Sequence, residues 1–325
     1  MRVHFFRHCL YDLLLCVFGV YFVFILSTIY LYNYSPAPLE DHEPPVVTLI
    51  DGENNRIAVG TGWEDPGVDA YDIFSDVYIK TEGEVEPNTV GEYSIKYIVS
   101  DESGNTTEIT RTVSIIQPAG TIYLTFDDGP GEHTGRLLDV LKKYNVKATF
   151  FVTGRGDDSY FKREYDEGHT VALHTNTHNY SYIYSSVDNY FEDLYTISDR
   201  VKSQIGIEPK LIRFPGGSSN LVSTRYDHRS HIMSTLVNEV TARGYTFFDW
   251  NVDSGDAGGA SSADEVYNNV ISRLNVGGDS VVLQHDIKGF SVDAVERIIQ
   301  YGISNDFLFK KLSSDSFNAH HSVNN

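Results

Sequence analysis

The sequence predicts an α/β protein, a distorted or open (β/α) barrel that follows a small all-β sandwich and an N-terminal transmembrane helix. Three observations lead to this prediction. Residues 13–32 are apolar and uncharged, residues 46–117 hold short runs of alternating polarity, and strand-like and helix-like segments alternate from Thr121 onward. The predicted segments are an N-terminal piece (1–12), an anchor (13–32), a stalk (33–45), the sandwich (46–117), the barrel domain (118–312) and a disordered tail (313–325).

The anchor is predicted from the stretch LLLCVFGVYFVFILSTIYLY, which is as long as the roughly 20 apolar residues that span a bilayer. Arg2 and Arg7 precede it and acidic residues follow it, so the positive-inside rule places residues 1–12 in the cytoplasm and the rest outside. A cleaved signal peptide is the alternative, but its apolar core is usually about 7–15 residues, and SPAP is a poor cleavage site. We therefore expect a single-pass protein of the cell membrane with an extracellular C-terminal domain.

Charge and cysteine content exclude other classes of protein. The formal net charge is −20, whereas phosphate recognition needs a basic surface, so we expect no nucleic-acid partner. Residues 40–117 hold 17 Asp and Glu against 4 Lys and Arg, a net charge of −13, which is typical of a solvated surface. Cys9 and Cys16 are the two cysteines and lie at the extreme N-terminus, so there is neither a disulfide framework nor a cysteine-based zinc site.

The stalk and the sandwich follow from composition and period. The stalk NYSPAPLEDHEPP is rich in proline and charge, which indicates a semi-rigid spacer. Runs such as DVYIK and EYSIKYIVS alternate polar and apolar residues, and turn signals such as DGENN and DESGN separate them. A stretch of such short, half-buried strands indicates a β-sandwich, and QPAG at 117–120 is the expected joint to the next domain.

The barrel domain alternates strands with helices, which indicates a mostly parallel sheet. The expected strands are TIYLTF, KATFFV, TVAL, KLIRF, YTFFDWNV, SVVLQHDI and DFLFKKL. The expected helices are LLDVLKKY, VDNYFEDLYTISDRVKSQI and segments near 229–243, 263–274 and 291–301. We interpret His169 as structural or as a support behind the metal ligands, and His320 and His321 of the polar tail as solvated. In such folds the chemistry takes place where strands end.

Polar residues at two of these strand ends suggest a metal site. Asp127 and Asp128 end the run TIYLTFDD, and adjacent carboxylates repel each other unless a cation or a proton intervenes. HTNTH places His174 and His178 four residues apart, so both imidazoles can face one cation on a helical turn. One aspartate and two histidines leave positions open for water and substrate, and the other aspartate can accept a proton. Spacing alone does not say which aspartate does which.

Five motifs occur in the order found in the polysaccharide deacetylases, the NodB-homology carbohydrate esterases of family 4: TFDDGP, HTNTH, RFPGGS, the Asp-rich NVDSGDA and LQH. Residues 121–312 therefore resemble this family. The run EYSIKYIVSDESGNTTEITRTVSI resembles the bacterial immunoglobulin-like modules of surface proteins. Together the two resemblances imply a deacetylase domain behind an immunoglobulin-like sandwich.

The family resemblance implies roles for the charged residues of the motifs. Asp128, His174 and His178 would bind a divalent metal, with zinc the expected ion. Asp127 would be the catalytic base, and His285 would be the general acid for the departing amine. Such a set suits amide hydrolysis, which needs an activated water and a proton for a poor leaving group.

The resemblance also implies supporting roles. Arg213 would position and tune Asp127, and Asp256 is the candidate for holding Arg213 in turn. The N–H near Gly216 would stabilise the oxyanion, and Leu283 would line the pocket for the acetyl methyl group.

Two motifs depart from the family pattern. Gly216 and Gly217 stand where an aromatic residue often follows the proline, so the backbone donor remains but the aromatic wall is lost. The fourth motif ends in Ala257 instead of tryptophan, and the earlier Trp250 is our candidate for a substrate contact. Within this motif, Asp253 is the second choice, after Asp256, for holding Arg213. These changes predict a more open groove.

The expected function is the removal of N-acetyl groups from an N-acetylglucosamine polysaccharide at the cell surface. Peptidoglycan is the first choice, because the anchor, the stalk and the sandwich place the enzyme within reach of a cell wall. The alternatives are an O-acetyl esterase acting on xylan-like glycans and an inactive carbohydrate-binding surface protein. For the sandwich itself, a spacer role is preferred over sugar binding.

Overall fold

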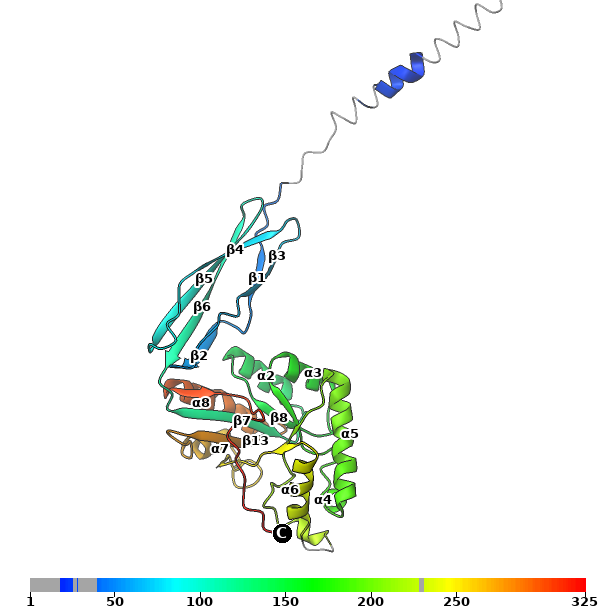
Figure 1. Cartoon of the computed structure of the whole chain (residues 1–325), viewed down its shortest axis with the longest axis vertical. Helices are drawn as coiled ribbons and strands as arrows, with labels where there is room; N and C mark the ends of the chain where they lie inside the picture. The colour runs from blue at the N-terminus through cyan, green and yellow to red at the C-terminus, as the bar shows by residue number, and fades with distance from the viewer. Residues whose placement is uncertain (1–17, 26–27, 29–39, 228–230) are drawn as a thin grey trace, which may run out of the picture. The chain divides into compact units, whose positions relative to one another are not determined.

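The computed structural model describes residues 18–25, 28, 40–227 and 231–325 (Figure 1). Residues 18–25 are helical. Within these described ranges, no helix is long and apolar enough to cross a membrane. The predicted segments 1–12, 13–32 and 33–45 fall mostly or wholly outside the described residues, so the anchor and the stalk stay predictions.

The region predicted to be a sandwich forms two small sheets. One pairs β1 (Val46–Leu49) with β3 (Val68–Tyr71), and the other has the order β2-β6-β5-β4. The bounds of the second sheet's strands are β2 (Asn54–Ala58), β4 (Val77–Glu82), β5 (Gly91–Asp101) and β6 (Thr106–Ile116). Burial alternates residue by residue along β5, as the period-two pattern predicts. Leu49 of β1 packs with Ile95 and Tyr97 of β5, so the two sheets share a core.

The second region is a parallel sheet with the order β11-β10-β9-β8-β7-β13-β12, and β14 also pairs with β7. Its strands are β7 (Gly120–Asp127), β8 (Thr149–Val152), β9 (Thr170–Leu173), β10 (Leu211–Ile212), β11 (Thr246–Phe247), β12 (Val252–Asp253), β13 (Asp279–His285) and β14 (Phe307–Phe309). The prediction of a mostly parallel α/β sheet is confirmed.

The sheet curls into an open barrel. Its two edge strands, β11 and β12, are consecutive in the chain, and residues 248–251 connect them. A fully extended chain from Phe247 to Val252 spans at most about 18 Å, so the two edges of the sheet face each other across a gap of that size or less. The missing pairing between them makes the barrel incomplete, as the sequence predicts.

Helices cover one face of this sheet and surround strands β7, β8 and β13 in Figure 1. They are α2 (Thr134–Lys143), α3 (Ser159–Asp166), α4 (Tyr180–Ile183), α5 (Val187–Ile205), η1 (Ser223–Arg225), α6 (Ile232–Ala242), α7 (Ala263–Ile271) and α8 (Gly289–Ser304). The helix predicted at 187–205 is α5, which Ser186 caps at its start and left-handed Gly206 ends. The short helices α3 and α4 were not predicted.

Side chains alternate between two cores. Ile122, Leu124 and Phe126 of β7 belong to the core between sheet and helices, whereas Tyr123 belongs to a second cluster on the opposite face. We call this opposite face the inner face. It also holds side chains from other strands and from the C-terminal tail: Phe151, Ala172, Leu211, Phe248, Val281, Leu312 and Ala319.

The tail at 313–325 is ordered, so the prediction of a disordered tail is wrong. Asp249 donates its backbone N–H to the carbonyl of Ala319, which is 5% exposed, and Asn325 donates its side-chain amide to the carbonyl of Asn220. His320 stacks on Phe247, with ring centres 3.8 Å apart, and it stays exposed to solvent as predicted. An incomplete barrel leaves part of its inner face uncovered, and Ala319 of the tail packs there, which a polar sequence does not reveal.

Candidate active site

Strand alternation gathers the site on the inner face. Asp127 lies an even number of residues after Tyr123 on β7, and His285 lies likewise after Val281 on β13. In the parallel register, His285 is the direct partner of Asp127. His174 and Arg213 follow β9 and β10 with the same parity relative to the inner-face residues of those strands. The period of two therefore directs four predicted residues to one side of the sheet, at the ends of its strands.

Asp128 joins this site because the chain turns immediately after β7. By simple alternation its side chain would point to the helix side, but its φ is +73°, in the left-handed region. Its Oδ1 lies 3.3 Å from Nε2 of His178 and 3.7 Å from Nε2 of His174. The three predicted metal ligands are thus brought together, with ligand atoms within 4.8 Å of one another.

His174 and His178 do not lie on a helical turn, so the prediction that a helix directs both imidazoles to one cation is wrong. Residues 174–179 form an irregular loop, and both Thr175 and His178 have a positive φ, at 67° and 52°. Asp193 of α5 accepts hydrogen bonds from the N–H groups of Asn176 and Thr177 and so shapes the loop. The loop conformation, and not a helix, therefore brings the two imidazoles together. Its positive φ angles raise the free energy of the backbone, and the surrounding contacts must offset that rise.

The chemistry of these groups fits a divalent cation. Nδ1 of His174 is 2.8 Å from the carbonyl oxygen of Arg213, so Nδ1 carries the proton and Nε2 keeps its lone pair for the site. Burial, together with the neighbouring His178, lowers the pKa of His174 to about 3, which keeps the imidazole neutral. Oδ1 of Asp128 is buried and accepts no hydrogen bond from the described residues. A neutral nitrogen facing a buried, unpartnered carboxylate oxygen suits a metal better than a proton.

Arg213 holds Asp127, as the family resemblance implies. Its Nη1 donates to Oδ1 of Asp127 and to Thr125 Oγ1, each at 2.7 Å. Its other donors go to the carbonyl oxygens of Phe248 and Asp249. Burial raises the pKa of Asp127, and the charges of Arg213 and His285 act against that rise. Thr125 was missed, although it precedes Asp127 by two residues and so shares its face.

Asp256 holds His285 and not Arg213, which corrects the prediction. Its Oδ1 lies 2.8 Å from Nδ1 of His285, and its Oδ2 accepts the backbone N–H of His285 at 2.7 Å. Burial opposes the charged imidazolium, but this hydrogen bond and the charges of Asp256, Asp127 and Asp128 raise the pKa of His285 to about 9. Asp253 is exposed and accepts a hydrogen bond from Gly255, so it takes no part. The spacing of residues along the chain did not reveal whether Asp256 would contact Arg213 or His285.

The glycines of the third motif are backed by aromatic rings, so the prediction of lost walls and a more open groove is wrong at this point. A Cβ built on Gly216 would lie 3.1 Å from the Tyr180 hydroxyl, and one on Gly217 would lie 3.0 Å from the Trp250 ring. Rings from elsewhere in the chain thus occupy the space beside the two glycines. Tyr180 was missed, and its only sequence signal is its place two residues after His178.

The remaining predicted residues have mixed outcomes. The backbone N–H of Gly216 donates to no described residue, which leaves it free for a ligand. Leu283 is buried on the inner face two residues before His285, as a lining residue must be. Trp250 is half-buried, with Arg213 5.7 Å from its ring centre, and its contact with substrate stays a prediction. His169 accepts the N–H of Ala148 and takes no part in the site, in line with a structural role.

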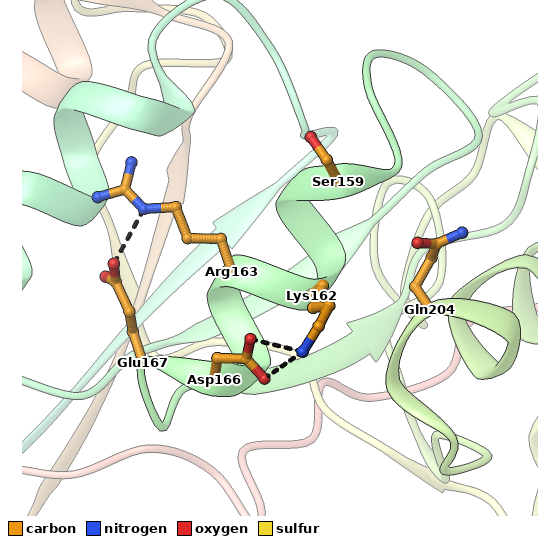
Figure 2. A pocket seen from close by; sticks show the side chains of 6 residues that line it. All are labelled: Ser159, Lys162, Arg163, Asp166, Glu167 and Gln204. Carbon is orange, nitrogen blue, oxygen red and sulfur yellow. Dashed lines mark hydrogen bonds and ion pairs between the residues drawn. The ribbon is translucent and has the colours of Figure 1, made fainter. Parts of the chain in front are cut away.

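Two other features do not belong to this site. A hollow of about 430 Å³ lies beside α3, where Lys162 pairs with Asp166 and Arg163 pairs with Glu167 (Figure 2). Its charges are satisfied by one another, and Glu167 precedes β9, at the end of the strand away from the metal ligands. In the sandwich, Asp41, Asp72 and Asp101 form a second carboxylate cluster, whose oxygens accept hydrogen bonds from their own turns.

Known proteins match both regions of the chain. The family model described as polysaccharide deacetylase matches residues 115–232, and the one described as bacterial surface protein, Ig-like domain, matches residues 47–115. A peptidoglycan-N-acetylglucosamine deacetylase of Bacillus cereus is 35% identical over 190 residues, which are 55% of this chain and 64% of the relative. A second protein of that description from the same species is 35% identical over 187 residues, 55% of this chain and 62% of the relative. The chain thus spans slightly less than two thirds of these relatives.

A solved structure matches more completely. The catalytic domain of a peptidoglycan N-acetylglucosamine deacetylase from Eubacterium rectale is 52% identical, with a TM-score of 0.61. The match covers 63% of this chain and 94% of that domain.

Proposed function

Since this chain belongs to the polysaccharide deacetylase family and carries a bacterial surface immunoglobulin-like module, we propose that it is a metal-dependent hydrolase that removes N-acetyl groups from the N-acetylglucosamine of peptidoglycan. One observation carries the proposal. A carboxylate held by a buried arginine and a histidine held by a buried carboxylate lie on neighbouring strand ends, beside three converging metal ligands. This arrangement supplies a base, an acid and a cation site within one small region.

Asp128, His174 and His178 would hold the cation, and zinc suits their one carboxylate oxygen and two imidazole nitrogens. When bound, such a cation polarises the amide carbonyl and lowers the pKa of water.

Asp127 is the base in this proposal. Arg213 binds its Oδ1, whereas its Oδ2 lies 3.7 Å from Nε2 of His174 and is the oxygen left to accept the proton of the attacking water. A pKa raised by burial makes the carboxylate a stronger base, and the adjacent guanidinium keeps it ionised. The water oxygen then bonds to the acyl carbon.

His285 is the acid, and the Gly216 amide supports the oxyanion. With Nδ1 bound to Asp256, Nε2–H is the free donor of His285, and a pKa of about 9 keeps the ring protonated at neutral pH. The proton passes to the amine nitrogen, the carbon–nitrogen bond breaks, and acetate and a free amine result. The unpartnered N–H of Gly216 donates to the carbonyl oxygen while that oxygen carries negative charge.

Two arguments support peptidoglycan and the cell surface. The matched relatives and the matched catalytic domain are described as acting on peptidoglycan N-acetylglucosamine. The apolar run at 13–32 and the surface-protein module would hold the catalytic domain outside the membrane, close to a wall. An O-acetyl esterase would use the same residues with an easier leaving group.

The test is acetate release by the zinc-loaded, full-length protein from N-acetylglucosamine oligomers, isolated peptidoglycan and acetylated xylan. We expect release from the first two substrates, and a loss of at least 100-fold in Asp127→Asn and His174→Ala. Asp166→Asn is the matched control, because it makes the same chemical change on the exposed surface of α3. Equally low release by all four proteins on every substrate would favour an inert binding module, and release from xylan alone would favour the esterase.

A further inference from the structure

The side chain of Tyr180 lies between a metal ligand and the candidate oxyanion donor. Its ring centre is 5.2 Å from that of His178, with the rings nearly perpendicular at 86°. On its other side, a Cβ built on Gly216 would meet the Tyr180 hydroxyl at 3.1 Å and the ring carbon Cε1 at 3.4 Å. A Cβ and the amide nitrogen are bonded to the same Cα, so the hydroxyl and the free N–H of Gly216 border the same small region.

The hydroxyl of Tyr180 has no partner among the described residues, and this sets it apart from two neighbouring tyrosines. Tyr182 donates to Oε2 of Glu192 at 2.8 Å, and Tyr184 donates to the carbonyl oxygen of Pro215 at 2.7 Å. No hydrogen bond joins the Tyr180 hydroxyl to the described chain. A half-buried phenol normally finds a partner, so a bound molecule is the natural one here.

The surrounding contacts hold Tyr180 in place. Asn179 caps α4 by accepting the N–H of Ser181, which fixes the start of the helix. The Tyr184 hydroxyl fastens the other end of this segment to Pro215, directly before Gly216. The Tyr180 ring also packs on the Tyr184 ring at 5.7 Å. Both candidate donors are therefore positioned before any substrate arrives, which is the condition for useful electrostatic stabilisation.

Glycine at position 216 and tyrosine at position 180 pack closely against each other. Gly216 has a φ of +78°, and a Cβ there would come within 3.1 Å of the Tyr180 hydroxyl and 3.3 Å of the Asn220 Cβ, so a side chain would be both strained and crowded. The chain thus places an aromatic side chain from α4 beside the residue that follows the proline. The glycine departure in the third motif leaves room for this ring.

We propose that Tyr180 is a further catalytic residue, whose hydroxyl donates a hydrogen bond to the acetyl carbonyl oxygen as negative charge develops there, alongside the Gly216 amide. Its ring forms one wall of the space for the acetyl group. This inference rests on the proposed deacetylase function and adds a second, side-chain donor for the oxyanion.

The kinetic test compares Tyr180→Phe and Tyr180→Ala with Tyr182→Phe in the zinc-loaded, full-length protein. Tyr182 is the matched control, because it lies on the same helix as Tyr180 and its exposed hydroxyl donates to Glu192 of α5. On N-acetylglucosamine oligomers we expect Tyr180→Phe to lower kcat about 100-fold with KM changed less than about 2-fold, since the donor acts mainly in the transition state. Tyr180→Ala should also raise KM, and zinc content should equal that of wild type in all three variants.

A binding test separates this proposal from the proposed function. Acetohydroxamate, which presents an acyl oxygen, is titrated by calorimetry into the zinc-loaded proteins, and we expect about 10-fold weaker binding to Tyr180→Phe alone. Unchanged kcat and affinity in Tyr180→Phe would overturn the Tyr180 proposal and leave the deacetylase function standing. A wild type that releases no acetate, but loses affinity on Tyr180→Phe, would overturn the function and keep the contact. A wild type that neither releases acetate nor binds would overturn both.

Discussion

Arg111 of the sandwich and Arg213 of the barrel domain are both fully buried, but they differ in what their donors reach. Arg111 donates to several groups of its own domain, with hydrogen bonds of 2.7–3.1 Å to the oxygens of Ile50, Gly52, Asn55, Gly67 and Tyr97. These partners are backbone carbonyls and neutral side chains, and the nearest carboxylate, Asp65, is 3.5 Å away. Arg111 therefore stabilises the packing of loops within the sandwich through its hydrogen bonds.

Arg213 combines the same kind of anchoring with one different contact. It too donates to backbone carbonyls, those of Phe248 and Asp249, but its Nη1 reaches Asp127, whose second oxygen accepts no hydrogen bond from the described residues. The comparison shows that burial of an arginine does not mark a site. What marks it is a donor directed at a carboxylate that keeps one oxygen for chemistry.

Replacing Arg213 should have the largest effect. Arg213→Met removes the charge that keeps Asp127 ionised and oriented, so we expect kcat on N-acetylglucosamine oligomers to fall about 1,000-fold. Steady-state kinetics with a matched measurement of zinc content would check this. Arg213→Lys should recover little, because one ammonium cannot reproduce the fork of donors. Activity close to wild type in Arg213→Lys would mean that charge alone matters.

A smaller effect, visible in the pH profile, is expected from Asp256→Asn. Asp256 contributes to raising the pKa of His285 to about 9, and the acid must be protonated, so wild-type activity should fall as the pH rises through about 9. The amide lacks the negative charge, so the alkaline limb should move down toward the ordinary histidine pKa of about 6.5. An alkaline limb that stays at its wild-type position would exclude His285 as the group that titrates there.

For the sandwich, Arg111→Met should change stability and leave catalysis intact. Removing the guanidinium takes a donor from three partly buried backbone carbonyls, and we expect the free energy of unfolding to fall by about 3 kcal/mol. Urea denaturation of the full-length protein would measure it, and kcat on soluble oligomers should stay within about 2-fold of wild type. A large loss of kcat would show that the two arginines are less different in function than their contacts indicate.

The smallest effect is expected from the ring beneath Arg213. The guanidinium carbon lies 4.1 Å from the centre of the Phe151 ring, so Phe151→Leu removes a cation–π contact but keeps the apolar volume. We expect kcat to fall about 3–10-fold, with little change in KM. An unchanged kcat would show that hydrogen bonds alone orient the guanidinium.

Much of the fold can be predicted from local patterns in the sequence. Alternating polarity predicts the strands of the sandwich, and the helical period predicts α5 at 187–205, because both patterns follow from side-chain direction within one element. The parity of Asp127, His174, Arg213 and His285 within or directly after their strands is also a local property. The ordered motifs therefore suffice to name the metal ligands, the base and the acid that the structure brings together.

Contacts between segments that are distant in the sequence could not be predicted from local patterns. Asp256 binds His285 instead of Arg213, Tyr180 occupies the space beside Gly216, and Ala319 of the polar tail packs on the inner face of the barrel. Each depends on how far the sheet curls and on where loops of irregular backbone turn, and neither follows from residue order. The chain's own pattern establishes which groups face the inner side of the sheet, because alternation is a property of a single strand. Which group each of them touches is set by packing between strands and loops, because that depends on distances in space.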